Sequence, residues 1–381
     1  MGRLLAFHNQ RLAVANSLCY GTPMEKLSRR KVLLGGGAAA ASLPLIHSLL
    51  PSHRHPWHAG EASAATAPDG GPGQSGAKPA MGGHGGGVNG PTFRKGAAVD
   101  HRANGFNPTD VLRDFDWGKT RRINGRVYRE WEVVAIDKEI EVAPGIKYPA
   151  WTFNGRVPGP TLRCRQDEKL RVRFVNGSEH PHTMHFHGFH MPAMDGIGEE
   201  GDGVIAPGKS TVYEFEGDPF GLHLYHCHVS PLAEHIARGL YGTFIIDPKD
   251  GREDADELMM VMNGFNTNFD AEGNQIYAVN TVAFHHQNEP IKVRRGELVR
   301  IYLVNMLEYD PINSFHTHAN FFQYYPTGTS LTPNELTDTV VLGQAQRGIL
   351  EMRFRFPGQF MFHAHKTEFA ELGWMGFFEV S

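Results

Sequence analysis

Cysteine is scarce in this sequence, with 3 cysteines among 381 residues. Cys19 lies in an N-terminal segment that we expect to be absent from the mature protein. Cys227 is flanked by histidines, which favours a role as a metal ligand, and Cys164 is then left without a partner. We therefore predict no disulfide framework, although the N-terminal segment indicates an exported protein.

The sequence also lacks an excess of charge and a long helical pattern. Its formal net charge is -4 and its pI is about 6.6, which argues against nucleic acid or an anionic membrane surface as a partner. Apolar residues follow a helical period over no long stretch, and only residues 232–237 indicate one short helix. These absences leave β-structure as the main element of the fold.

Paired arginines precede a Gly/Ala-rich run near the N-terminus. Arg29 and Arg30 stand before a weakly hydrophobic stretch, an arrangement that resembles a twin-arginine export signal. The glycines and the proline of this stretch make it a poor membrane-spanning helix, so we expect no stable membrane insertion. We interpret residues 1–67 as the export signal region, with Met24 as a natural start, and expect a periplasmic or extracellular protein.

Glycine, proline and alanine dominate the next segment, up to about Val99, and almost no apolar periodicity is present there. Such a segment cannot bury a core. We predict a flexible leader over residues 68–121 and ordered structure from about Arg122 onwards.

Short runs rich in valine, isoleucine, tyrosine and phenylalanine fill the rest of the chain, with turn clusters such as Asn154-Gly155 and Pro207-Gly208 between them. Short strands at this spacing are typical of an antiparallel β-sandwich. The expected strands are residues 127–136, 170–175, 211–215 and 241–246 in a first set, and residues 258–262, 298–305, 339–342, 349–354 and 377–380 in a second set. A turn-rich junction between the sets divides the chain into domains of residues 122–250 and 251–381.

The two domains repeat each other. His-x-His motifs at residues 185–187 and 226–228 of the first domain correspond to those at residues 316–318 and 363–365 of the second. Two copies of one sandwich are the economical interpretation.

Each His-x-His motif presents two imidazoles on one face of a strand, because alternate side chains of a strand point the same way. Neutral imidazoles suit copper, and eight of them are more than one copper ion needs. The motifs therefore indicate a cluster of several copper ions. The eight residues are His185, His187, His226, His228, His316, His318, His363 and His365.

The opposite face carries a different ligand set. Cys227 separates His226 from His228, so its thiol points away from them. His182 lies an odd number of residues before the first histidine pair, which directs it to the side of Cys227, and His235 follows in the next loop. Two imidazoles and one thiolate form the trigonal ligand set of a blue copper centre.

A weak axial ligand, often methionine, normally completes such a centre. Counting along the loop gives the axial place to Leu240, whose side chain cannot coordinate a metal. The absence of an axial donor should raise the reduction potential of the blue copper. Methionines nearby in the sequence remain alternatives for the axial place. They are Met184, Met191 and Met194.

Together these motifs resemble the multicopper oxidase family, in its two-domain, laccase-like branch, from about residue 122 to the end. The resemblance implies an all-β fold of two tandem cupredoxin-like domains, which are Greek-key β-sandwiches. It also implies four copper ions per chain: one blue (type 1), one type 2 and two type 3. In this family a small-molecule or metal-ion reductant is oxidised by single electrons, and O2 is reduced to water.

By motif position, the resemblance implies that His182, Cys227 and His235 hold the type 1 copper, and that His185 and His316 hold the type 2 copper. The residues implied for the type 3 pair are His187, His226, His228, His318, His363 and His365.

The second domain departs from the first at the blue site. Ala364 stands where the first domain has Cys227, and Asn313 stands where it has His182, so only the first domain can hold a type 1 copper. Two-domain members of the family are similar in assembling as homotrimers. The resemblance therefore implies trinuclear clusters between subunits, where domain 1 of one chain faces domain 2 of the next.

Three residues are candidates for moving electrons and protons. Cys227 offers a short covalent route for electrons, through its own backbone, to His226 or His228. Asp195 and Glu368 lie near histidine motifs and are candidate proton relays, because a carboxylate near copper can act as an acid or base. The alternative for both is an ordinary turn or surface carboxylate.

Five further histidines lie outside this scheme. They could fix the orientation of ligand imidazoles, or they could be exposed polar residues. They are His180, His190, His223, His285 and His286.

Two alternatives compete with an oxidase. Copper nitrite reductases also have two cupredoxin domains and form trimers, and the loop from Cys227 to His235 is similar in length to theirs. That family, however, has an aspartate at the position of His185 and a non-ligand at that of His228. A non-catalytic copper-binding protein of the cell envelope would not need the blue site at Cys227. The electron donor stays open among phenols, aromatic amines and the ions Cu(I), Fe(II) and Mn(II).

Overall fold

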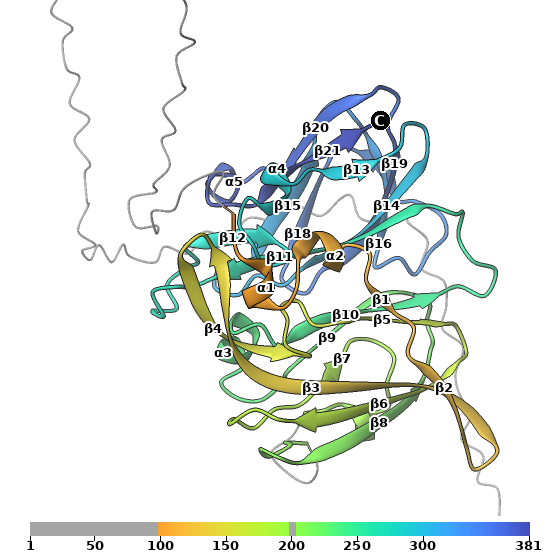
Figure 1. Ribbon diagram of the computed structural model, residues 1–381. Coiled ribbons are helices and arrows are strands. Elements are labelled where there is room, and N and C mark those ends of the chain that lie inside the picture. Colours follow the sequence, from red (N-terminus) through yellow and green to blue (C-terminus); the bar gives the residue numbers. More distant parts are fainter. Residues whose placement is uncertain (1–97, 198–202) are drawn as a thin grey trace, which may run out of the picture. The chain divides into compact units, whose positions relative to one another are not determined.

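The computed structural model describes residues 98–197 and 203–381. Two β-sandwiches follow one another along this part of the chain, as Figure 1 shows. The proposed twin-arginine signal and most of the proposed leader lie outside the described residues. Within the described part, no helix has the length and apolar character needed to cross a membrane.

The first sandwich consists of two sheets. One has the strand order β1 (Phe115–Asp116), β5 (Thr161–Arg165), β10 (Tyr241–Asp247), β9 (Gly221–His226) and β7 (His185–Phe186). The other has the order β2 (Lys119–Ile123), β3 (Arg126–Ala143), β6 (Lys169–Asn176) and β8 (Ser210–Glu216), and β4 (Ile146–Phe153) also pairs with β3.

The second sandwich is built in the same way. One sheet has the order β12 (Ile276–Val279), β11 (Asp256–Phe265), β14 (Leu298–Asn305), β19 (Arg347–Arg353), β16 (Phe322–Pro326) and β17 (Glu335–Thr337). The other has the order β13 (Ile291–Val293), β21 (Met375–Val380), β20 (Gly358–His363), β15 (Ile312–Thr317) and β18 (Thr339–Gly343).

Strand directions confirm that the halves repeat each other. In the first half β10 runs parallel to β5 and antiparallel to β9, which is antiparallel to β7. In the second half β21 runs parallel to β13 and antiparallel to β20, which is antiparallel to β15. Every strand expected from the sequence is present, and the sandwiches are mainly antiparallel with some parallel pairs that the expected antiparallel sandwich did not include. Pairs such as β3 and β6 are parallel because the chain visits the other sheet between them.

The helices are short. Residues 232–237 form α3, as predicted from the sequence, and α5 follows the last histidine motif in the same way as α3 follows that of the first half. The helices are α1 (His101–Asn104), α2 (Pro108–Val111), α3 (Leu232–Ala237), α4 (His285–Asn288) and α5 (Thr367–Glu371), with a 3-10 turn at Pro192–Met194.

Ordered structure begins before Arg122, so the predicted flexible leader over residues 68–121 extended too far. Residues 98–121 contain α1, α2 and β1 and the start of β2. The side chains of Asp100 and Asn107 cap the two helices, and Pro108 occupies the first turn of α2. These elements are too short to produce an apolar period, and packing against the two sandwiches holds them in place.

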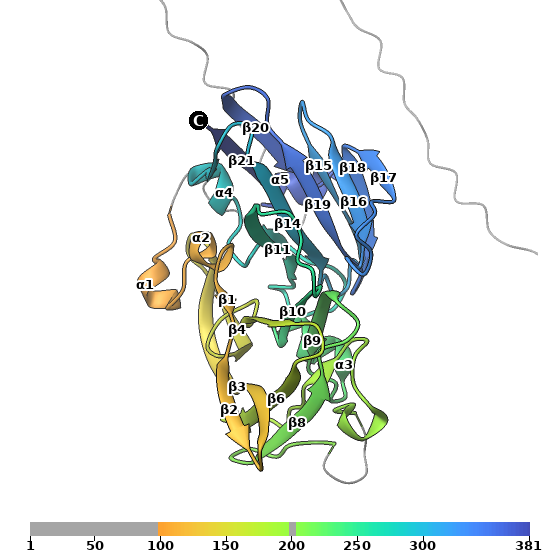
Figure 2. The same ribbon diagram turned by 90° about the vertical axis from the view of Figure 1, so that its right-hand side faces the viewer.

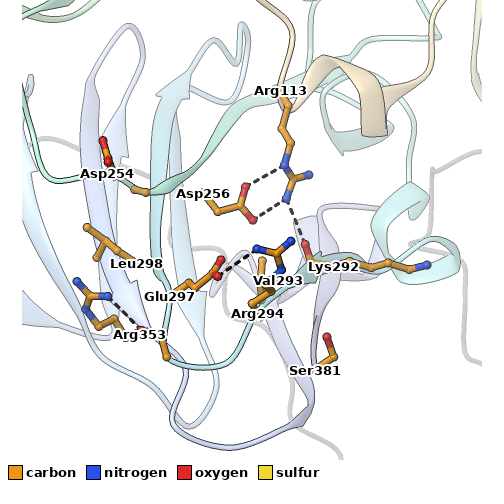
Figure 3. A pocket seen from close by; sticks show the side chains of 12 residues that line it. Arg113, Asp254, Asp256, Lys292, Val293, Arg294, Glu297, Leu298, Arg353 and Ser381 are labelled. Carbon is orange, nitrogen blue, oxygen red and sulfur yellow. Dashed lines mark hydrogen bonds and ion pairs between the residues drawn. The ribbon is translucent and has the colours of Figure 1, made fainter.

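The first described residues, 98–114, lie along the junction of the two sandwiches, where Figures 1 and 2 draw them in orange. We call residues 98–114 the N-terminal segment from here on. The Asn104 side chain exchanges two hydrogen bonds with the backbone of Glu141 in β3, at 2.9 and 2.8 Å. Arg113 instead reaches the second sandwich: it pairs with Asp256 at 2.9 and 2.8 Å and donates to the carbonyl of Lys292 at 3.2 Å (Figure 3). The segment therefore ties the two halves together.

Each sandwich has its own apolar core, and a third buried cluster joins them. The joint cluster includes Leu222, Tyr241 and Ile245 from the first half with Val261 and Tyr302 from the second. Because this surface is apolar and fully buried, the two halves pack as a domain core does rather than as a loose contact.

A buried charge network crosses the same junction. Arg163 on β5 binds Asp247 at 2.8 and 2.9 Å and Glu257 on β11 at 2.6 and 3.1 Å. Arg300 adds a bond of 3.1 Å to Glu257. Burial alone would raise the pKa of Glu257, but the hydrogen bond and charge of Arg163 outweigh it and lower that pKa.

We predict that Arg163→Met destabilises the protein by about 3 kcal/mol, because Asp247 and Glu257, both partly buried, lose their shared guanidinium, although Glu257 keeps Arg300 and Tyr302. The measurement is the free energy of unfolding in a denaturant titration. Arg165→Met is the matched control, since Arg165 lies in the same strand but is exposed, and we expect it to change stability by about 0.5 kcal/mol or less. Equal stabilities of the two variants would contradict the role assigned to the network.

Candidate metal centres

Cys227, the middle residue of the His-x-His motif at residues 226–228, lies one residue past the end of β9. Its N–H donates to the carbonyl of Leu240 at 2.9 Å, so the chain continues beside the start of β10. His182 is brought in by an isolated bridge to Ile205, and His235 lies in α3. Cys227, His182 and His235 are all buried and come together as one group.

The three ligand atoms form a compact triangle. Cys227 Sγ lies 3.7 Å from Nδ1 of His182 and 3.2 Å from Nδ1 of His235, and the two nitrogens are 3.2 Å apart. Ligand atoms about 2.0–2.3 Å from a shared trigonal ion would be roughly 3.5–4 Å apart. The triangle therefore fits one copper ion after a small expansion.

Hydrogen bonds orient the triangle. Nε2 of His182 lies 2.9 Å from Oγ of Ser178, which donates to Asp137 at 2.6 Å, so Nδ1 of the ring is left to face the thiol. The N–H of Thr183 donates to Cys227 Sγ at 3.4 Å. Sequence reasoning missed Ser178 and Asp137, because they come from other elements and belong to no motif.

Burial sets the charge of these groups. It lowers the pKa of His182 to about 3 and that of His235 to about 4, so both rings are neutral at ordinary pH and can bind a metal. It raises the pKa of the Cys227 thiol. A bound metal ion supplies the positive charge that makes the thiolate stable there.

Leu240 is fully buried in the same apolar cluster as Cys227. Met184 is also buried in that cluster, and Met194 packs against it, whereas Met191 is 55% exposed. An exposed side chain cannot serve a buried centre, so Met191 is removed from the axial alternatives. Leu240 remains the prediction for the axial position.

Four imidazoles of the first half gather on the other side of the same chain segment. His185 on β7 pairs directly across from His226 on β9. Nε2 of His187 lies 3.0 Å from Nε2 of His226, whose Nδ1 is 2.7 Å from the carbonyl of Cys227. The His228 ring centroid lies 5.1 Å from that of His185. We call this group the first half-site.

The second half of the chain repeats this arrangement, as a second half-site. His316 on β15 pairs across from His363 on β20. Nε2 of His318 lies 3.1 Å from Nε2 of His363, whose Nδ1 is 2.7 Å from the carbonyl of Ala364. The His365 ring centroid lies 5.2 Å from that of His316. In both halves the backbone occupies one ring nitrogen and leaves Nε2 free for a metal.

Within the described part of one chain, the ligand atoms of the two half-sites form separate groups. Among residues 98–197 and 203–381, no group of ligand atoms within 4.8 Å of one another combines histidines of both halves. Burial lowers the pKa of His187 to about 3 and of His226 to about 4, and it also lowers the pKa of His318 and His363. Each half-site thus offers neutral imidazoles to a metal.

The two proposed proton relays have different surroundings. Asp195 Oδ1 lies 3.0 Å from Nδ1 of His185 and 3.3 Å from Nε2 of His190. Glu368 is exposed in α5, three residues after His365. In the second half-site the place of Asp195 is taken by Asp338, whose carbonyl oxygen lies 3.0 Å from Nδ1 of His316. The sequence carried no motif that signalled Asp338.

The remaining histidines are mostly not exposed polar residues. His223, His285 and His286 are buried, and His190 lies beside His185 and Asp195. Only His180 is exposed among these five. The sequence left both interpretations open for these histidines, because a single polar residue gives no burial pattern.

Trp151 links His180 to the triangle. Its ring centroid lies 4.6 Å from that of His180, 4.8 Å from that of His235 and 5.4 Å from that of His182. An open cavity lies at this surface. It is lined in part by Asp137, Glu139, Trp151, His180, Glu234 and Arg238.

The fold and these sites define a two-domain copper protein of the cupredoxin type. Models of the multicopper oxidase family match residues 136–251 and 254–381. A solved multicopper oxidase structure is 60% identical with a TM-score of 0.73, and the match covers 74% of this chain and 100% of that one. This chain belongs to the multicopper oxidase family, whose members are copper oxidoreductases.

Copper nitrite reductases are also similar. The enzyme of Neisseria gonorrhoeae is 29% identical over 251 residues, which are 60% of this chain and 62% of that protein. The structure of the Nitrosomonas europaea enzyme is 25% identical with a TM-score of 0.58, covering 67% of this chain and 94% of that one. The chain thus spans less than two thirds of the length of the N. gonorrhoeae relative.

We predict that Ser178→Ala weakens copper binding at the triangle by about 10–100-fold, because His182 loses the hydrogen bond that orients it. The measurement is the blue absorbance of the protein as a competing chelator is added. Thr339→Val is the matched control: it removes a 2.9 Å contact to Nδ1 of His316 in the second half-site and leaves the triangle untouched. Equal retention of the blue colour in Ser178→Ala and the native protein would refute the assignment.

Proposed function

We propose that this protein is a laccase-like oxidase that couples one-electron oxidation of a small reductant to four-electron reduction of O2. The observation that carries the proposal is the placement of one thiolate triangle and one four-histidine half-site on opposite sides of residues 226–228. Copper, when bound, would supply the one-electron redox chemistry: one type 1 ion in the triangle and one type 2 and two type 3 ions at the paired half-sites.

The chain itself provides the route between the sites. Cys227 is joined by peptide bonds to His226 and His228, so the thiolate and two imidazoles of the half-site share one short covalent path. Buried apolar residues around Cys227 exclude water from the triangle. The ligands need little rearrangement, because backbone carbonyls and Ser178 already hold the rings.

Proton supply is assigned to Asp195. Its carboxylate touches His185 and His190 at the edge of the first half-site, in a partly exposed position from which it can exchange protons with solvent. Glu368 remains a second candidate, on its sequence position and exposure alone.

Electron entry is assigned to Trp151. Its aromatic ring contacts both imidazoles of the triangle and lines the cavity beside them, so a reductant there is separated from the ligands by one side chain. Three carboxylates and an arginine line this cavity, a mixture that suits small aromatic donors as well as metal ions. Export to the periplasm or beyond is proposed on the twin-arginine motif alone.

We predict that Cys227→Ser abolishes O2 uptake with a phenol panel and with Cu(I), Fe(II) and Mn(II), because the covalent route loses its thiolate. The measurement is O2 consumption by copper-loaded protein. Cys164→Ala is the matched control, since Cys164 is also buried but lies outside every group of ligands in the described residues. O2 uptake that persists in Cys227→Ser would contradict the electron route.

Nitrite reduction is the competing function, and the similarity to nitrite reductases is the observation that favours it. Each half-site has four imidazoles, and this number argues for the oxidase, because a site for a single copper ion needs fewer imidazole ligands. Nitrite consumption by the native protein without O2 uptake would transfer the assignment to that reaction.

We also propose that the half-sites pair between subunits, in a homotrimer. Each half-site holds four imidazoles, and within the described part of one chain the two sets of ligand atoms form no common group. The second half-site lies at the surface, beside the exposed apolar side chains of Ile312 and Val341. Two different patches that meet head to tail generate a closed ring when the rotation from one subunit to the next closes, as it would in a trimer.

We predict that Val341→Glu converts the assembly to monomers, because a carboxylate would be buried without a partner. Multi-angle light scattering measures the mass, and metal analysis should show loss of the half-site copper with retention of the blue colour. Val127→Glu is the control, at an exposed valine of β3 in the other half. A native monomer with full oxidase activity would remove the trimer proposal.

A further inference from the structure

A further group of metal-ligating side chains lies away from the copper ligands, where residues 98–114 meet the second sandwich. His101 comes from α1, His285 begins α4, and Glu289 is the C-cap residue that follows α4. One ligand atom of each lies within 4.8 Å of the other two. None of the three belongs to the His-x-His motifs.

The geometry at His285 is close to that of a ligand site. Nε2 of His285 lies 3.7 Å from Oε2 of Glu289 and 2.8 Å from Oγ1 of Thr109 in α2. The Thr109 hydroxyl in turn donates to Oε2 of Glu289 at 3.5 Å. The rings of His101 and His285 meet edge to face with their centroids 4.9 Å apart.

These groups are incompletely paired as they stand. The His285 side chain is only 4% exposed, and its Nε2 lies in close hydrogen-bond contact with the Thr109 hydroxyl. Nδ1 of His101 is buried and has no hydrogen-bond partner among the residues that the structure describes. A buried polar atom without a partner costs free energy, which a bound ion would recover.

Access and charge also suit a cation. The Glu289 side chain is 53% exposed, so the group opens to solvent. Burial, with the neighbouring His286 and His101, lowers the pKa of His285 to about 2, so the ring is neutral. One carboxylate leaves one charge of a divalent ion unbalanced, and a hydroxide in a fourth position would balance it.

We propose that His101, His285 and Glu289 bind a divalent transition-metal ion of the zinc and copper type. Two histidines, one glutamate and an open position form a known ligand set for Zn²⁺, and the same donors bind Cu²⁺. Thr109 then donates its hydrogen bond to Glu289 and orients the carboxylate. The ion clamps α1 and α4 together, and so fastens the N-terminal segment to the second sandwich.

This site is independent of the oxidase reaction, and its test does not use activity. Copper-loaded protein, with its blue absorbance monitored throughout, is titrated with Zn²⁺ by calorimetry. We expect one Zn²⁺ per chain, with affinity reduced at least about tenfold in His101→Ala and in Glu289→Gln. Glu272→Gln, at an exposed glutamate outside every group of ligands in the described residues, should bind as the native protein does.

Hydrogen exchange provides a second readout. Zn²⁺ should slow exchange of backbone amides in residues 100–112 of the native protein and leave those of Glu289→Gln unchanged. Either variant alone suffices if the other fails to fold, since they alter different elements. Equal Zn²⁺ affinity in the native protein and a folded variant, or no Zn²⁺ binding by the native protein, would overturn the proposal.

Discussion

The peptide bonds that join Cys227 to His226 and His228 are the constraint on which the copper chemistry depends. Because neighbouring side chains of an extended segment point to opposite sides, the thiol reaches one ligand set while the imidazoles of His226 and His228 both lie beside His185. The hydrogen bond from Cys227 to Leu240 keeps this segment extended beyond the end of β9. The surrounding sandwich then supplies partners on both sides: His182 and His235 of α3 for the thiol, and His185 of β7 for the imidazoles.

The repeat shows which parts of this arrangement are general. Both half-sites use a cross-strand histidine pair and a backbone carbonyl that occupies one ring nitrogen. The second half lacks the thiol: Ala364 is buried where Cys227 stands in the first half. One framework therefore serves as a complete double site in one domain and as a histidine site alone in the other.

The junction between the sandwiches carries a separate set of constraints. An apolar cluster, the Arg163 network and the N-terminal segment all cross it. Fixing the halves against each other also fixes the directions in which their half-sites face. A half-site that cannot reach its counterpart within the chain must then find it on another copy, which is the physical reason for the proposed ring.

Most of the strand positions and the grouping of Cys227 with His182 and His235 could be predicted from the sequence, because alternation along a strand depends only on local geometry. The parallel pairings could not be, since they follow from how the chain moves between sheets. The same limit applies to Ser178, Trp151 and the group of His101, His285 and Glu289, which come from segments far apart in the chain. Sequence alone determined which ligands share a face; tertiary packing decided what surrounds them, because contacts between distant segments leave no local period to read.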